Sequence, residues 1–100
     1  MDVKQFDAVA IRASELIQVL AHPARLRIAC ALVSGEASVV HLAGLLGDPE
    51  QDVHRHLALL RKERIIRARR KKKRAYYALR DEKLAAVIAA MAQIFLAAHC

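Results

Sequence analysis

Residues 48–77 read DPEQDVHRHLALLRKERIIRARRKKKRAYY, and this stretch decides the fold. It begins as a helix should: Asp48 is the expected N-cap, Pro49 the expected first helical residue, and acidic or amide side chains fill the first turn. Apolar residues recur at i, i+4 and i+7 as Val53, Leu57 and Leu60, which predicts one buried stripe. The opposite face is polar or small and consists of Gln51, His54, Arg55, Ala58 and Lys62.

A basic hairpin is expected to follow this helix. The predicted strands are 66–70 and 75–79, and lysines at 71–73 fill the turn where a glycine is usual. One turn residue is therefore expected to adopt a positive φ without being glycine. A helix with a free polar face, followed by a cationic β-ribbon, suits a DNA groove and its flanking phosphates.

The positive charge is concentrated in the same stretch. Residues 61–74 contain ten Lys or Arg and one acid, a balance of +9, whereas the other residues contain seven Lys or Arg and nine Asp or Glu, a balance of −2. A solvated charge run is the alternative interpretation. Because ten neighbouring cations repel one another, a polyanionic partner is the favoured one.

The composition predicts a single helical domain that spans residues 1–100. Hydrophobic residues make up 56% and aromatic residues only 4%, so the core must be aliphatic and rich in alanine, which favours helices. A chain of 100 residues buries only a thin core by itself, so a homodimer is expected.

The expected location is the cytoplasm, without membrane contact. The first residues lack the apolar segment and cleavage site of a signal peptide. The longest weakly polar run, 84–98, is shorter than the roughly 20 residues that a bilayer span needs. Two cysteines do not form a disulfide scaffold, so reduced thiols are expected.

Four further helices are predicted around the opening stretch. The first is 5–20, the second is 24–33 after Pro23, and the third is 39–46, capped by Ser38 and closed by Gly47. The last runs from 83 to about 99 behind an Asp-Glu cap. The expected apolar positions are Phe6, Val9, Ala13, Ile17 and Leu20 in the first helix, Leu26, Ala29 and Leu32 or Val33 in the second, and Leu84, Val87, Met91, Ile94 and Phe95 in the last.

The predicted order, α-α-α-α-β-β-α, is that of a mainly α winged helix-turn-helix with an extra helix at each end. The text that carries a family resemblance is LAHPARL at 20–26, SVVHLAGLLG at 38–47, VHRHLALLR at 53–61 and YYAL at 76–79. With these segments the chain resembles the ArsR/SmtB family of bacterial repressors. The resemblance implies a homodimer through the first and last helices, bound to a partly palindromic operator of double-stranded DNA until a small inducer arrives.

Within that family the chain is most similar to the dithiol branch, which senses sulfide, persulfide or oxidants. The resemblance places one sensing cysteine in the second helix, where Cys30 stands, and its partner directly after an Ile-Phe pair in the last helix. Here Leu96 follows that pair, and the second cysteine is Cys100. Four residues are about 6 Å of helix, which is long compared with the Cα separations of about 4.4–6.8 Å that a disulfide tolerates. Fraying of the last turn, or a bridge with extra sulfur atoms, would span the gap.

The DNA-contacting residues are expected in two groups. The recognition helix and its approach contribute Ser38, Gln51, His54 and Arg55, and the hairpin contributes Arg69, Arg70, Lys71, Lys72, Lys73 and Arg74. Gln and Arg can form bidentate contacts with adenine and guanine. An ordinary solvated helix face is the alternative.

The expected sensing residues are Cys30 and Cys100, with two alternatives. Cys30 can instead be a small buried hydrophobe, or a metal or metalloid can be held by Cys30, His99 and Cys100. The other metal sites implied by the resemblance are missing, because 39–41 and Lys83 occupy their positions. No cofactor and no enzymatic activity are expected, since no catalytic motif is present. A non-sensing, architectural nucleic-acid-binding module is the alternative function.

Overall fold

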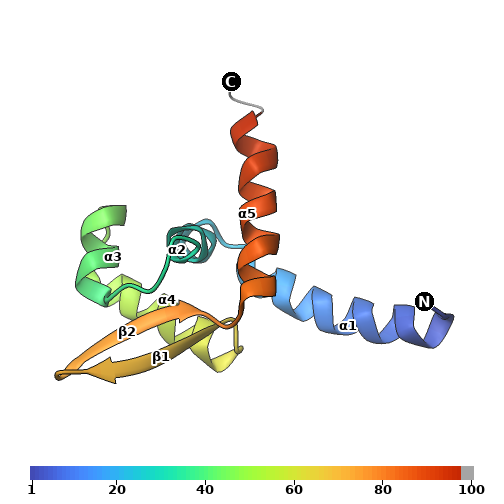
Figure 1. The fold of residues 1–100 in the computed structure, drawn as a ribbon, viewed down its shortest axis with the longest axis horizontal. Coiled ribbons are helices and arrows are strands. Elements are labelled where there is room, and N and C mark those ends of the chain that lie inside the picture. The colour runs from blue at the N-terminus through green and yellow to red at the C-terminus, as the bar shows by residue number, and fades with distance from the viewer. Residues whose placement is uncertain (98–100) are drawn as a thin grey trace.

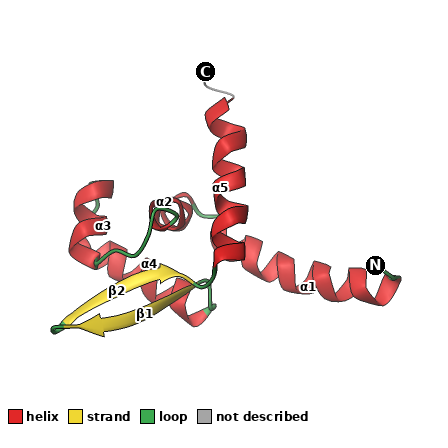
Figure 2. Cartoon of the chain, in the orientation of Figure 1, coloured by secondary structure: helices red, strands yellow, loops and turns green. Residues whose placement is uncertain are grey.

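The structure, a computed structural model, describes residues 1–97 and contains five helices and one hairpin in the predicted order. The elements are α1 (Val3–Leu20), α2 (Pro23–Leu32), α3 (Val39–Leu46), α4 (Glu50–Lys62), β1 (Ile66–Lys71), β2 (Arg74–Leu79) and α5 (Glu82–Ala97). Figure 1 shows α2, α3 and α4 gathered beside the hairpin, while α1 and α5 extend away from this body in different directions. The fold is a winged helix-turn-helix, with β1 and β2 as the wing (Figure 2).

The core lies between α2, α3, α4, the base of the wing and the first half of α5. Its fully buried side chains are those of Ile28, Leu42, Val53, Leu57, Leu60, Ile65 and Ile88. The stripe predicted for α4 is therefore confirmed. In α2 the prediction was partly wrong: Ile28 is buried together with Ala29 and Leu32, whereas Leu26 is only half-buried. The inward face of α2 is centred between 28 and 32, and Leu26 lies at its edge, next to α3.

The turn between α3 and α4 follows the sequence prediction except at its cap. Ser38 Oγ accepts the backbone N–H of His41 at 3.1 Å, and Gly47 ends α3 with a left-handed φ of 72°. Asp48, however, is not the N-cap of α4. The first N–H groups of that helix donate to the Pro49 carbonyl, which makes Pro49 the N-cap. The Asp48 carboxylate instead accepts from Arg27 at 3.3 Å, so it ties the turn to α2.

The wing is a regular antiparallel hairpin, one residue longer on each strand than predicted. Its register pairs Ile66 with Leu79 at the base and Lys71 with Arg74 at the tip. The two-residue turn leaves both Lys72 and Lys73 at positive φ, 50° and 67°, where only one such residue was expected. The reason is the turn geometry, because a tight two-residue hairpin of this hand requires positive φ at both central residues.

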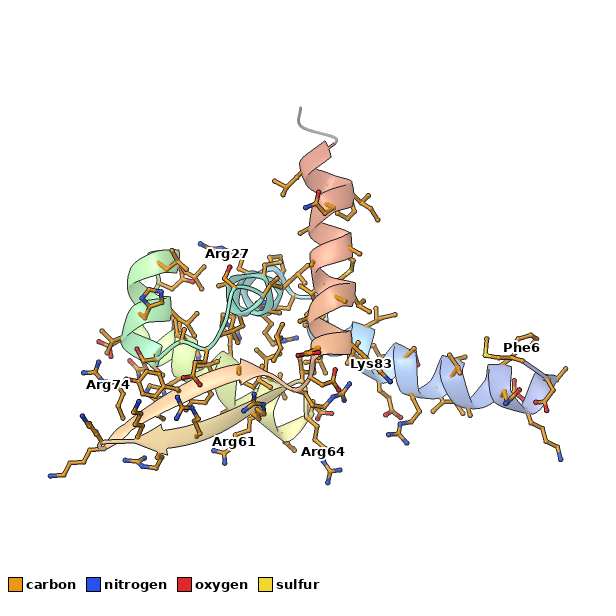
Figure 3. The ribbon with its side chains drawn as sticks, in the orientation of Figure 1. Phe6, Arg27, Arg61, Arg64, Arg74 and Lys83 are labelled. Carbon is orange, nitrogen blue, oxygen red and sulfur yellow. The ribbon has the colours of Figure 1, made fainter. Side chains whose placement is uncertain are left out.

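The outer helices bury little of their apolar surface within the chain. In α1 the predicted stripe is buried only at Leu20, while Phe6, near the free end of the helix (Figure 3), is half-exposed. The apolar side predicted for α5 is in fact two faces. Leu84 and Ile88 point into the core, whereas Val87, Ile94 and Phe95 remain exposed. Among the described residues, no helix is long and apolar enough to cross a bilayer.

Candidate nucleic-acid interface

The outward face of α4 is the first part of the site. Gln51, His54, Arg55, Ala58 and Lys62 are all exposed, as predicted. The face is free because Val53, Leu57 and Leu60 anchor the opposite side of the helix in the core with at most 1% exposure. Glu50 and Asp52 lie in the first turn, where their charges complement the positive end of the helix dipole. The helix thus presents mobile polar side chains from a rigid support.

Arg55 is oriented within this face by a neighbouring acid. Its Nη2 donates to Asp52 Oδ1 at 2.6 Å, one helical turn toward the N-terminus, and both side chains are largely exposed. An exposed pair of this kind contributes little to stability. It does hold the guanidinium near the start of α4, and the contact uses only one of its nitrogen groups, so the fork can still donate to a ligand.

A groove between α4 and the wing forms the second part of the site. Its lining combines cationic, aromatic and apolar side chains, namely His54, Leu57, Ala58, Arg61, Lys62 and Tyr77. Arg61 and Lys62 were not in the predicted set. The signal for them was available, because both belong to the cationic run 61–74 and both follow the outward face of α4 by helical spacing.

The wing tip carries the densest positive charge. Lys71, Lys72, Lys73 and Arg74 are exposed, and Figure 3 shows nitrogen-tipped side chains, including that of Arg74, spreading from the hairpin. Arg70 Nη2 donates to the Lys73 carbonyl at 3.3 Å across the turn. The structure therefore brings the outward face of α4 and the cationic tip to one side of the core, as two separate groups with the groove between them.

Two residues of the predicted set are already engaged inside the chain. Ser38 is only 7% exposed, and its hydroxyl oxygen caps α3. Arg69 forms a two-pronged pair with Glu36, donating from Nε at 2.7 Å and from Nη2 as well. This hydrogen-bonded pairing lowers the pKa of Glu36 and raises the pKa of Arg69. Their surroundings therefore differ from those of the free cations at the wing tip.

His56 lies behind the outward face, where sequence spacing left its role open. It is half-buried, and its ring centroid is 5.1 Å from that of His22, whose Nδ1 caps α2. Burial lowers the pKa of His56, and the nearby His22, Arg25 and Arg55 lower it further. His56 is accordingly a packed histidine that favours its neutral form.

Cys30 is exposed, so the alternative of a buried hydrophobe is wrong. Its side chain lines an apolar hollow between α2 and α3, together with Pro23, Leu26, Arg27, Ala31, Leu45 and Leu46. His99 and Cys100, the other residues of the predicted sensing and metal sites, lie outside the described residues. Within residues 1–97, no group of three or more His, Cys, Asp or Glu side chains is arranged to hold a metal ion.

Known proteins share this architecture and much of this sequence. No protein-family model matches the chain. The chain is similar to the biofilm growth-associated repressor of Agrobacterium fabrum, with 40% identity over 93 residues, 90% of this chain and 80% of the relative. The crystal structure of the transcriptional repressor BigR from Xylella fastidiosa matches with a TM-score of 0.84 and 33% identity, over 95% of this chain and 97% of that one. A homodimeric winged helix-turn-helix DNA-binding domain from Mycobacterium bovis, a possible ArsR-family regulator, matches with a TM-score of 0.79 and 26% identity, over 98% and 90% of the two chains.

Proposed function

The chain belongs to the ArsR/SmtB family of winged-helix transcriptional regulators, and from this premise we propose that it represses transcription by binding double-stranded DNA as a homodimer. The observation that carries the proposal is the pairing of an exposed polar face on α4 with a cationic wing on the same rigid body. A helix of this width fits the major groove, and a basic ribbon beside it reaches the flanking phosphates.

The two parts of the interface have different tasks in this proposal. Gln51, His54 and Arg55 contact base edges, because they extend from the N-terminal half of α4. The wing tip, 70–74, contacts phosphates together with Arg61 and Lys62 of the groove. The phosphate contacts supply affinity for any duplex, and the base contacts supply preference for one sequence.

A second copy of the chain completes the molecule. Phe6, Val9 and Ile17 on α1, and Ile94 and Phe95 on α5, are exposed by half or more of their surface. Apolar surface of this extent on the outer helices supports an interface between two copies. A two-fold dimer presents two copies of α4, which fits an operator that is partly palindromic, with half-sites about one helical turn apart.

Selection from a pool of random duplexes tests the function. The protein should enrich one partly palindromic sequence, and the enriched duplex should be retained in a large excess of random DNA. Equal retention of all duplexes would instead identify a non-sensing architectural module. Binding to RNA hairpins with higher affinity than to any duplex would also contradict the proposal.

We also propose that thiol chemistry at Cys30 and Cys100 releases the DNA. The exposure of Cys30 supports this, since a sensing thiol must be accessible. With a trisulfide donor the reaction balances as Cys30–SH + Cys100–SH + RSSSR → Cys30–S–S–S–Cys100 + 2 RSH. Each cysteine loses one proton, and the electron pair reduces the donor to two thiols. Hydrogen peroxide would give the direct disulfide slowly, with water as the product, or leave Cys100 as a sulfenic acid.

Mass spectrometry of the protein bound to its selected duplex tests the release. A trisulfide donor should add one sulfur atom, remove two hydrogens and release the duplex, while Cys30→Ser or Cys100→Ser should abolish the response without weakening DNA binding. A response that persists in the double variant would overturn the thiol proposal. Release by zinc or arsenite, with the sulfur donor inert, would replace it with a metal site at Cys30, His99 and Cys100.

A further inference from the structure

The segment 36–38 connects the wing to the start of α3. Glu36 accepts the two-pronged hydrogen bonds of Arg69. Ala37 exchanges two backbone hydrogen bonds with Tyr77 of β2, at 2.9 and 2.8 Å, and so adds one residue to the edge of the wing. Ser38 then caps α3. Three consecutive residues therefore join β1, β2 and the helix-turn-helix, and any rotation of the wing must disturb them.

Arg69 is held between a carboxylate and an aromatic ring. It lies opposite Tyr76 in the hairpin register, and its guanidinium carbon is 5.7 Å from the centre of that ring. The ring attracts the cation, and the Glu36 carboxylate matches the planar fork of the guanidinium with two parallel bonds. A lysine could not reproduce this geometry, because its ammonium group is a single point donor.

We propose that Glu36 and Arg69 fix the angle of the wing relative to α4, so that Arg69 is a positioning residue and not a phosphate ligand. This inference rests on the proposed DNA-binding function. If Arg69 left Glu36 for a phosphate, an unpaired carboxylate would remain beside the DNA backbone and repel it. The pair is partly exposed, with side-chain exposures of 47% and 34%, so it acts on orientation much more than on folding stability.

The consequence concerns sequence preference. The wing contacts phosphates at one place and α4 contacts base edges at another, so the angle between them determines which bases meet which side chains. When the pair is removed, the wing is free to turn and Arg69 is free to bind any phosphate. Binding to the selected duplex then weakens, while binding to random DNA is retained or strengthened.

Salt titrations of two matched variants test the role of Arg69. Each phosphate contact contributes about 0.9 to the slope of log affinity against log salt concentration. Lys72→Gln removes an exposed cation at the wing tip and should flatten this slope by about one such step. Arg69→Gln removes the same charge but should leave the slope unchanged, while reducing the preference for the selected duplex about tenfold. If Arg69→Gln flattens the slope as Lys72→Gln does and leaves the preference unchanged, Arg69 is a phosphate ligand and the inference is wrong.

Variants at Glu36 test the pair itself, without depending on DNA. Glu36→Gln should accelerate hydrogen exchange at the Ala37 and Tyr77 amides and leave the thermal midpoint nearly unchanged. The exchanged pair, Glu36→Arg with Arg69→Glu, should restore slow exchange and sequence preference. Unchanged exchange in Glu36→Gln would overturn the inference even if the wild-type protein binds one DNA sequence. Accelerated exchange in a protein that has no preferred duplex would leave the pair intact and overturn only the DNA-binding function.

Discussion

α4 and α5 are both anchored in the same core, yet they present opposite surfaces to the outside. α4 buries Val53, Leu57 and Leu60, and α5 buries Leu84 and Ile88. Outside, α4 is polar and cationic. The outward side of α5 is apolar, and Val87, Ile94 and Phe95 are 54%, 63% and 66% exposed. The same anchoring therefore supports two different kinds of recognition.

The difference between the two faces identifies their partners. A hydrated, charged face loses little by staying in water and gains from a polyanion whose counterions are released. An apolar face gains only when another apolar surface removes it from water. Hence we assign α4 to DNA and α5, with α1, to a second copy of the chain. Changes on each face should affect different measurements.

The largest effect is expected on the apolar face. Ile94→Asp would place a carboxylate in the dimer interface of each copy, where desolvation without a partner costs several kcal/mol. The dimer should dissociate or the chain should unfold, and DNA affinity should fall at least about 100-fold, since two half-sites are no longer bound together. Sedimentation velocity, with circular dichroism to follow folding, measures this.

A matched variant on α3 controls for the loss of an exposed apolar side chain. Val40 is 57% exposed and belongs to neither outer helix. Val40→Asp should therefore leave the dimer intact. The assignment of α5 would be wrong if the unmodified protein sedimented as a native-sized monomer, or if both variants remained dimeric.

Changes on the polar face of α4 come next. Arg55→Ala or Gln51→Ala should cost about 1–3 kcal/mol on the selected duplex, the usual value of one bidentate base contact, and much less on random DNA. Fluorescence anisotropy with both duplexes measures this difference. Equal losses on both duplexes would mean that α4 does not read bases, and the polar face would have to be reassigned to phosphate contacts.

The wing should show the opposite pattern. Lys72→Gln together with Lys73→Gln should weaken binding to the selected and the random duplex alike, and flatten the salt dependence by about 0.9 for each phosphate that the wing no longer neutralises. Glutamine is also not glycine, so the substitution leaves the positive-φ turn under a similar constraint. Weaker binding to the selected duplex alone would contradict the division between base and phosphate contacts.

The smallest effect is expected at His56, behind α4. Because burial lowers its pKa in the folded chain, protonation favours the unfolded state. Its contribution to the free energy of unfolding is fully present above the ordinary histidine pKa and is lost as the pH falls below it. The thermal midpoint should decrease more between pH 7.5 and 5.5 in the wild type than in His56→Gln. Identical decreases would show that His56 is not responsible.

The fold was largely predictable because its signals are local. Ser38 and Gly47 marked the ends of α3, and the spacing of Val53, Leu57 and Leu60 gave the buried side of α4. The cap of α4 was mistaken because Asp48 had a competing partner, Arg27, which lies 21 residues away in the sequence. Local propensity does not contain such a contact.

The site was less predictable than the fold for the same reason. Exposure of the polar face of α4 followed from periodicity, but the engagement of Arg69 by Glu36 joins residues that are 33 positions apart. The cationic run looked uniform as a sequence, and only the register of the hairpin separates a paired arginine from free ones. Similarly, α5 has two apolar faces where the sequence pattern suggested one, because both fit a helical period.

The most direct test of the assignment is the stoichiometry of the complex with one selected duplex. Multi-angle light scattering of the purified complex, at protein concentrations well above the dissociation constant, gives the number of chains per duplex. The account predicts two chains on the full palindromic site, and a large loss of affinity when one half-site is scrambled. One chain per duplex, with the same affinity for the full site and for a single half-site, would contradict it.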